Sequence, residues 1–320
     1  MTIKIVDRFI AHYQLIRPGQ TIVVGFSGGP DSTFLLHYLN SISPSFNLKL
    51  IAAHLDHEWR ESSVKDRKFC EEFCSQHNIE LVIARASLLP VIQKNTGSKE
   101  ELGRTLRRAF FQEVKKQYNA DSIALAHHLD DQIETFFIRL IRGASVTGLA
   151  SMRPHQGDYI RPLLCLKKQD ILDYLDKQHI NFVIDPTNTS QEYLRNRVRL
   201  NLVPALEQID KRALNSIAHV IEHLQETDDF LQNLARKTLK NSTDEKNGLS
   251  LKRFFLLDSF LQKLVLNQWL YTAQVPFVMT TALINEIIRF LKNNKSTTHH
   301  FNQWAIIKKR SMAEIVHIAV

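Results

Sequence analysis

The sequence predicts an α/β fold, a parallel sheet with helices on both faces, followed by a smaller, mainly helical domain. The first two hundred residues alternate short β-rich runs with amphipathic helical patterns, an order typical of βαβ units. After Pro204, long helical patterns replace this alternation. Right-handed crossovers place the carboxyl ends of parallel strands along one edge, where we expect a ligand site.

The alternation is regular from Thr21 to Arg142. Each expected strand is a short run of apolar and β-branched residues, and each expected helix repeats apolar residues at three- and four-residue intervals. In chain order the expected strands are residues 21–26, 48–54, 79–84 and 122–127, and the expected helices are residues 33–39, 63–76, 104–117 and 131–142.

The second part of the chain begins with a long helical pattern at residues 213–240. A polar loop follows, then two or three helical patterns at 251–293 with a break at Pro276, and short β-like runs at 300–320. We therefore expect one domain at residues 1–213 and a smaller, mainly helical one at residues 214–320.

Length, composition and charge limit the classes of protein to which the chain can belong. With 320 residues, 44% apolar and 23% charged, the chain resembles an ordinary two-domain globular protein. The net charge is +8, and residues 211–320 carry 15 basic against 9 acidic side chains. A basic C-terminal third favours a polyanionic partner, most commonly a nucleic acid.

We expect a cytoplasmic protein without a membrane partner. The N-terminus lacks the uninterrupted apolar run of a signal peptide, and polar residues break the most apolar later stretch, 254–270. Three cysteines suit a reducing compartment. Cys70, Cys74 and His77 lack a fourth ligand for zinc, which favours a buried helix face.

GFSGGPDST, residues 25–33, has the pattern of a strand, a glycine-rich turn and a helix start. Gly28 and Gly29 allow backbone N–H groups to approach phosphate oxygens, and the helix N-terminus adds partial positive charge. The Walker A lysine is absent, and so is the dinucleotide fingerprint. The stretch instead resembles the PP-loop of N-type ATP pyrophosphatases. That resemblance implies a Rossmann-like fold, ATP bound by Ser27, Gly28, Gly29, Pro30, Asp31 and Ser32, and cleavage between the α- and β-phosphates.

A second stretch, residues 124–149, predicts a helix with Asp130 as its N-cap. Its apolar residues follow the spacing of a core-facing helix and are Ile133, Phe136, Phe137, Leu140 and Ile141. The helix pattern does not account for the polar residues His127, His128 and Asp131. They cluster at the edge of the sheet where we expect a ligand. Asp131 and Glu134 share a helix face, which suits a metal ion or a cationic substrate.

Six blocks in order resemble the tRNA(Ile)-lysidine synthetase family. They are SGGPDS (27–32), HLDHEWR (54–60), EELGRTLRRAFF (100–111), AHHLDDQIETFFIRLIRG (126–143), RPLL (161–164) and DPTNTSQEYLRNRVRLNLVPAL (185–206). Residues 251–320 resemble the family's tRNA-binding region more loosely, and the length resembles short members without an additional domain. Gly103 stands where alanine is usual, and Arg108 where tyrosine is usual.

The resemblance implies adenylation of the wobble cytidine of isoleucine tRNA with a CAU anticodon, followed by attack of L-lysine. AMP and pyrophosphate leave, and lysidine forms. It implies that Asp31 holds Mg²⁺ and that Asp131 and Glu134 bind lysine. The catalytic set is then Asp31, Asp131, Arg107 and Arg197, with Arg104, Arg195 and Arg199 on tRNA or ATP phosphates.

Other interpretations stay open from the residues alone. The arginines at 195, 197 and 199 also fit a solvated basic face, and the histidines and aspartate of HLDH (54–57) also fit a metal site. The chain also fits a PP-loop tRNA thiolase, for which only Cys70 and Cys74 are candidate cysteines, or a catalytically silent RNA-binding protein. The intact Asp31 and glycine turn favour the active ligase.

Overall fold

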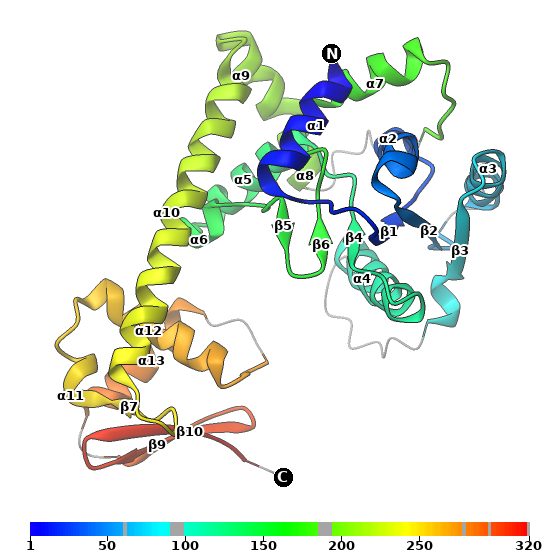
Figure 1. Cartoon of the computed structure of the whole chain (residues 1–320). Coiled ribbons are helices and arrows are strands. Elements are labelled where there is room, and N and C mark those ends of the chain that lie inside the picture. The colour runs from blue at the N-terminus through cyan, green and yellow to red at the C-terminus, as the bar shows by residue number, and fades with distance from the viewer. Residues whose placement is uncertain (60–62, 90–98, 185–193, 277–279, 294–295, 319–320) are drawn as a thin grey trace. The chain divides into compact units, whose positions relative to one another are not determined.

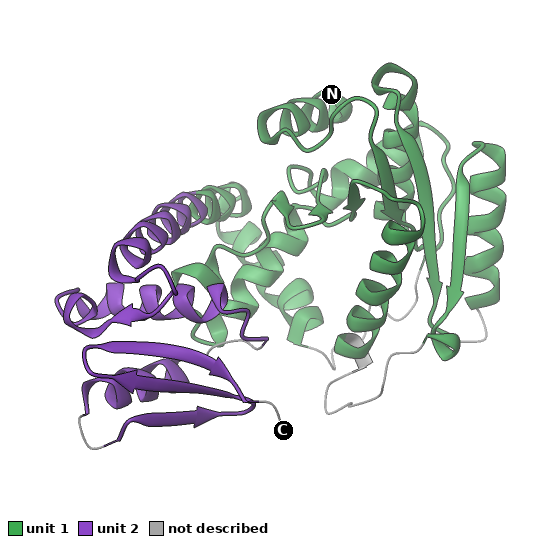
Figure 2. Cartoon of the chain, turned by 60° about the horizontal axis from the view of Figure 1, so that its bottom comes forward, with its two compact units in different colours: residues 1–222 green, residues 223–320 purple. Residues whose placement is uncertain are grey.

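A computed structural model describes residues 1–59, 63–89, 99–184, 194–276, 280–293 and 296–318. The chain forms two compact units, Met1–Glu222 and His223–Val320 (Figure 2). They divide within the long helix α10 (Ala213–Ser242), whereas the expected boundary, residue 213, lies at the start of this helix.

The first unit is built on a six-stranded sheet in the order β3-β2-β1-β4-β6-β5. Every neighbouring pair is parallel except β5 and β6, which form a short antiparallel hairpin. The strands are β1 (Thr21–Gly25), β2 (Lys49–Asp56), β3 (Glu80–Arg85), β4 (Ser122–Ala124), β5 (His155–Gln156) and β6 (Tyr159–Ile160). The predicted α/β class with a parallel sheet is confirmed.

Helices cover both faces of this sheet because alternate residues of β1 point to opposite sides. Ile22 and Val24 belong to one apolar core with α1, α2, α3 and α7, whereas Val23 belongs to another core with α4 (Figure 1). The helices are α1 (Thr2–Tyr13), α2 (Pro30–Phe46), α3 (Ser63–Gln76), α4 (Lys99–Gln117) and α7 (Lys168–Lys177). A 3₁₀ turn, η1 (Ala86–Leu88), follows β3.

The helix α5 (Leu129–Ile141) follows β4, and its N-terminal part is more buried than its C-terminal end. Ile133 is completely buried in a cluster with Val198, Val203 and Leu214. The prediction that Leu140 and Ile141 face the core is wrong: they are 48% and 60% exposed. The cluster packs on the earlier turns of α5, so the apolar spacing continues beyond the part of the helix that is covered.

Short helices complete the unit after α5. They are α6 (Val146–Leu149), α8 (Leu194–Arg197), the π-helical segment η3 (Val198–Leu202) and α9 (Val203–Ile209). Together α8 and η3 carry Arg195, Arg197 and Arg199.

The second unit combines helices with a four-stranded antiparallel sheet in the order β7-β10-β9-β8. Its elements are the later part of α10, β7 (Leu249–Ser250), α11 (Leu251–Phe254), α12 (Ser259–Thr272), α13 (Thr281–Lys292), β8 (Thr298–Phe301), β9 (Trp304–Lys309) and β10 (Met312–His317). The predicted helices are present, and the β-like runs of the tail pair into this sheet. Among the helices described, none combines the length and apolar character that a bilayer span requires.

Replacing Ile133 with alanine tests the cluster beneath α5. Removing a completely buried isoleucine leaves a cavity and should lower the free energy of unfolding of the first unit by about 2–5 kcal/mol. Urea denaturation followed by circular dichroism measures the change. The control is Leu140→Ala on the same helix, where we expect a smaller loss, less than about 1 kcal/mol, because about half of the side chain is exposed. Equal effects of the two substitutions would contradict the described burial.

Candidate active site

The glycine-rich turn connects β1 to α2 at the carboxyl edge of the sheet. Gly28 has φ +80°, and a Cβ there would lie 3.1 Å from Phe69 Cδ1 and 3.2 Å from Cys70 Sγ. The position therefore requires glycine on two grounds, backbone conformation and space.

Two serines fix the shape of the turn. The Ser27 N–H donates to Ser32 Oγ at 3.2 Å, and the Ser32 hydroxyl donates to the Gly29 carbonyl at 3.0 Å. Gly29 is the N-cap of α2 and Pro30 follows it in the first turn. The structure thus brings all six predicted ATP-binding residues into one turn at a helix N-terminus, an arrangement that suits an anion.

The helix α5 begins beside this turn, because β4 pairs with β1 in parallel. Its N-cap is His128, whose N–H donates to Asp131 Oδ2 at 3.1 Å. The prediction of Asp130 as the N-cap is wrong, because the helix starts at Leu129. The Asp130 carboxylate instead accepts the backbone N–H of Lys168 at 2.9 Å, at the start of α7.

His128 connects the two halves of the site. Its buried imidazole Nε2 lies 3.8 Å from Asp31 Oδ2 and 3.4 Å from Asp131 Oδ2. Burial alone would lower the pKa of this imidazole, but the carboxylates of Asp131, Asp130 and Asp31 outweigh burial and raise it. From the sequence His128 had no assigned role, and the structure places it between two predicted catalytic carboxylates, Asp31 and Asp131.

Asp131 and Glu134 face two arginines instead of open solvent. Arg195 donates through Nε to Glu134 at 2.7 Å and through Nη2 to Asp131 at 2.8 Å. Arg199 Nε donates to the other Glu134 oxygen at 2.6 Å. Glu134 is 1% exposed, so its buried carboxylate is satisfied by both guanidinium groups. We call these four residues the carboxylate–arginine cluster.

Neighbouring charges and burial determine the protonation states of Asp131 and His127. Burial opposes ionisation of Asp131, but the neighbouring charges of His128 and Arg195 hold the pKa of this carboxyl well below its usual range. The adjacent His127 behaves oppositely: burial, together with the charges of Arg161, Arg195 and Arg104, lowers its pKa to about 4. At neutral pH Asp131 is therefore an anion and His127 is uncharged.

The remaining predicted arginines lie on the surface. Arg104 and Arg107 on α4 and Arg197 on α8 are exposed. Arg104 is near enough to His127 to affect its pKa, and Arg107 similarly contributes to lowering the pKa of His57 to about 4, after the larger effect of burial. The structure thus brings Arg104 and Arg195 toward the half-buried His127, whereas no described contact brings Arg197 into the carboxylate–arginine cluster.

Gly103, one of the two departures from the resemblance, packs against an aromatic ring. A Cβ at this position would lie 2.7 Å from Trp59 Cη2. The Trp59 ring stacks on His57 with ring centroids 4.5 Å apart. Glycine at position 103 therefore accommodates the indole beside α4.

Sequence reasoning missed two basic residues of the site. Lys168 Nζ donates to Asp31 Oδ1 at 2.6 Å. Arg161 is 5% exposed and donates to the Arg153 carbonyl at 2.7 Å. Burial, with the charges of Arg104 and Arg108, lowers its pKa to about 10. Arg161 is the first residue of the RPLL block, so its part in the resemblance could have identified it. Lys168 carried no such indication, because only the fold brings it to the loop.

The three cysteines are free thiols in this structure. Cys70 and Cys74 are buried in α3, and burial raises the pKa of all three thiols, to about 12 for Cys74 and Cys165. Thiols held neutral in this way are poor nucleophiles. Among the residues that the structure describes, no group of three His, Cys, Asp or Glu side chains is arranged to hold a metal.

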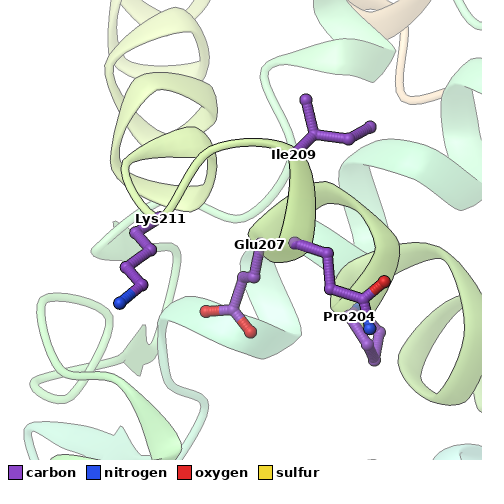
Figure 3. A pocket seen from close by; sticks show the side chains of 5 residues that line it. Pro204, Glu207, Ile209 and Lys211 are labelled. Carbon is purple, nitrogen blue, oxygen red and sulfur yellow. The ribbon is translucent and has the colours of Figure 1, made fainter.

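A separate hollow lies at the end of α9 and the turn that follows it (Figure 3). It is lined by Pro204, Glu207, Gln208, Ile209 and Lys211. None of the predicted site residues lines it, so we place the candidate active site at the turn after β1 and the carboxylate–arginine cluster.

Comparison with known proteins identifies the family. A profile described as a PP-loop domain matches residues 2–206. A tRNA(Ile)-lysidine synthase from Bacteroides thetaiotaomicron is 31% identical over 308 residues, covering 96% of this chain and 70% of the relative. The chain belongs to the tRNA(Ile)-lysidine synthase family. A Bacillus cereus tRNA(Ile)-lysidine synthase is 33% identical over 303 residues, covering 91% of this chain, but the chain spans only 63% of its length.

A solved structure supports the fold of this tRNA(Ile)-lysidine synthase family member. The U34-tRNA thiolase from Methanococcus maripaludis, determined with its 4Fe-4S cluster, superposes with a TM-score of 0.61 at 22% identity. The match covers 70% of this chain and 78% of that chain. At this identity it shows a shared fold and carries no conclusion about chemistry.

Substitution of the two loop glycines tests the turn. Gly28→Ala forces a side chain into the left-handed region against Phe69 and Cys70, so it should destabilise the first unit by at least about 1–2 kcal/mol. Gly29→Ala is the matched control, since its Cβ would meet only Ser27 Oγ, at 3.5 Å. Urea denaturation of both variants measures the difference. Stability of Gly28→Ala equal to that of Gly29→Ala would contradict the described turn.

Proposed function

We propose that the protein attaches L-lysine to carbon 2 of the wobble cytidine of isoleucine tRNA with a CAU anticodon, using ATP and forming lysidine. The observation that carries this proposal is the proximity of the loop to the carboxylate–arginine cluster. His128 lies within 3.8 Å of Asp31 on one side and within 3.4 Å of Asp131 on the other. An anion site and a carboxylate pair thus adjoin, as the joining of a nucleotide to an amine requires.

In the first half-reaction the cytidine 2-oxygen attacks the α-phosphate of ATP, and pyrophosphate leaves. The turn from Ser27 to Ser32 holds the phosphates through backbone N–H groups and the start of α2. We propose that Arg104 and Arg107, exposed on α4, approach the phosphate on which negative charge develops. We propose that the exposed Arg197, on α8, approaches the same phosphate.

The residues present are compatible with Mg²⁺. Magnesium in nucleotide sites is usually held by one or two carboxylates together with substrate phosphates and water. Asp31 is 28% exposed in the turn, so its carboxylate is accessible to an ion. Asp31 would hold the ion, which supplies charge neutralisation at the phosphates.

In the second half-reaction the lysine amine displaces AMP from the adenylated cytidine. We propose that Asp131 and Glu134 receive the cationic amino acid and that one of them accepts the proton released before attack. Their present partners, Arg195 and Arg199, then donate to phosphate oxygens of ATP or tRNA, for which a guanidinium fork is well suited. The carboxylates and the guanidinium groups therefore have partners of opposite charge both in the free protein and with the substrates bound.

Unit 2 is proposed to contribute to tRNA binding. Its surplus of basic residues suits a polyanion, and counterion release then makes tRNA affinity fall with salt. The competing proposal of a PP-loop thiolase finds no support in the cysteines, because Cys70 and Cys74 are buried with raised pKa values.

Incubation with total tRNA, ATP and radiolabelled lysine tests the function and its products. We expect label in tRNA and, in equal amount, AMP and pyrophosphate, because the loop resembles one that holds a leaving pyrophosphate. Asp31→Ala should lose at least about 100-fold in rate, because its carboxylate would hold the Mg²⁺ that neutralises charge at the phosphates. Its circular dichroism should match the unmodified protein. ADP and phosphate as tRNA-dependent products, or labelling that does not require ATP, would refute the proposal.

Glu134→Gln separates the two half-reactions. The substitution keeps the shape but removes the charge that Arg195 and Arg199 share, so the variant is assayed at a temperature where circular dichroism shows it folded. A charge-assisted hydrogen bond is worth about 1.5–3 kcal/mol. The lysine concentration for half-maximal rate should therefore rise about 10- to 100-fold, with tRNA-dependent pyrophosphate release largely preserved. A lysine titration and a pyrophosphate assay without lysine measure the two effects. The control is Glu113→Gln, an exposed glutamate on α4. Unchanged lysine dependence with lost adenylation would place Glu134 on the nucleotide side instead.

A further inference from the structure

Lys168 contacts the predicted metal-binding carboxylate, and the mechanism above gives it no role. Its ammonium Nζ lies 2.6 Å from Asp31 Oδ1, although the two residues are 137 positions apart in the sequence. The side chains are 34% and 28% exposed, so the pair is open to a ligand at the turn.

The fold holds the base of the Lys168 side chain in a fixed place. Its backbone N–H donates to Asp130 Oδ2 at 2.9 Å, which ties the start of α7 to the start of α5. Farther along α7, the Tyr174 ring meets Phe34 of α2 edge-on, with centroids 5.0 Å apart. Ile171 is completely buried in the core that α2 shares. The helices α2 and α7 therefore pack directly against each other, which fixes the start of α7 relative to the loop.

The loop itself contains no cation. Residues 25–33 read GFSGGPDST, with no lysine where a Walker A loop has one. A departing pyrophosphate carries several negative charges, and an ammonium on a flexible stem with three N–H donors is a common phosphate ligand. Lys168 supplies this chemistry from a different helix.

We propose that Lys168 is the phosphate-binding cation of the loop and contacts the pyrophosphoryl oxygens of ATP and of the released pyrophosphate. The inference rests on the proposed use of ATP at this loop. In the structure Asp31 holds the ammonium in position. A partly exposed ion pair of this kind contributes little to stability, so a phosphate oxygen readily replaces the carboxylate.

Binding of inorganic pyrophosphate, measured by titration calorimetry with EDTA present, tests the proposal without metal or turnover. Lys168→Met removes the charge but keeps most of the stem. It should weaken binding about 10- to 100-fold, the effect of one charge-assisted hydrogen bond. Lys168→Arg keeps the charge and should retain most of the affinity. The matched control is Lys177→Met, an exposed lysine at the other end of α7, which should bind as the unmodified protein does.

A double-substitution cycle distinguishes direct phosphate binding from an indirect effect through Asp31. In the Asp31→Asn background the carboxylate charge is gone, yet a lysine that touches phosphate still contributes. Asp31→Asn/Lys168→Met should therefore bind pyrophosphate at least about 10-fold more weakly than Asp31→Asn alone. Equal affinities of these two variants, at a temperature where circular dichroism shows both folded, would overturn the proposal.

The outcomes also separate this inference from the proposed function. Lysine attachment by the unmodified protein tests the function alone. Failure to attach lysine, combined with weakened pyrophosphate binding in Lys168→Met, would reject the function and keep the inference. Lysine attachment combined with unchanged pyrophosphate binding in Lys168→Met would reject the inference and keep the function.

Discussion

The candidate site depends on the parallel pairing of β1 with β4. From β1 the chain moves to β2 on one side of the sheet and returns later to β4 on the other. The register sets Val24 opposite Ala124, so both strands end at the same level. The turn after β1 and the start of α5 consequently adjoin, which is the usual place for ligands in open α/β sheets. Asp31 and Asp131, a hundred residues apart, meet the same imidazole for this reason.

Charge balance is the second organising principle of the site. Asp31 is paired with Lys168, and Asp131 and Glu134 are paired with Arg195 and Arg199. Removing one partner of a buried pair is costly, whereas exchanging it for a similar group is not. An anionic substrate that takes over a guanidinium or an ammonium releases a carboxylate, and a cationic substrate is suited to occupy that carboxylate. The arrangement is therefore consistent with the proposed binding of a polyanion and an amine at the same site.

Much of the fold was predictable because each element has its own local pattern. The four strands and four helices expected between residues 21 and 142 lie within a few residues of their places, except that α2 and α4 are longer. The sequence analysis did not place α1, α7 or the β5–β6 hairpin. The six loop residues were predictable because they are contiguous. Lys168 was not, because nothing near it in the sequence links it to Asp31. The partners of Glu134 were also hidden: carboxylates three apart on a helix suggest an open cation site, and only tertiary packing brings two arginines to them. Leu140 and Ile141 show the converse case, in which apolar spacing continues where no neighbouring element covers it.

The contact between Gly103 and Trp59 links two positions that are 44 residues apart. The indole fills the volume that the methyl group of an alanine would need, so the change at position 103 depends on the residue at position 59. An alanine at position 103 would displace the indole and disturb its stacking on His57. The two positions are therefore coupled in this chain: a side chain at position 103 requires the partly exposed Trp59 to move, whereas a smaller side chain at position 59 removes the clash.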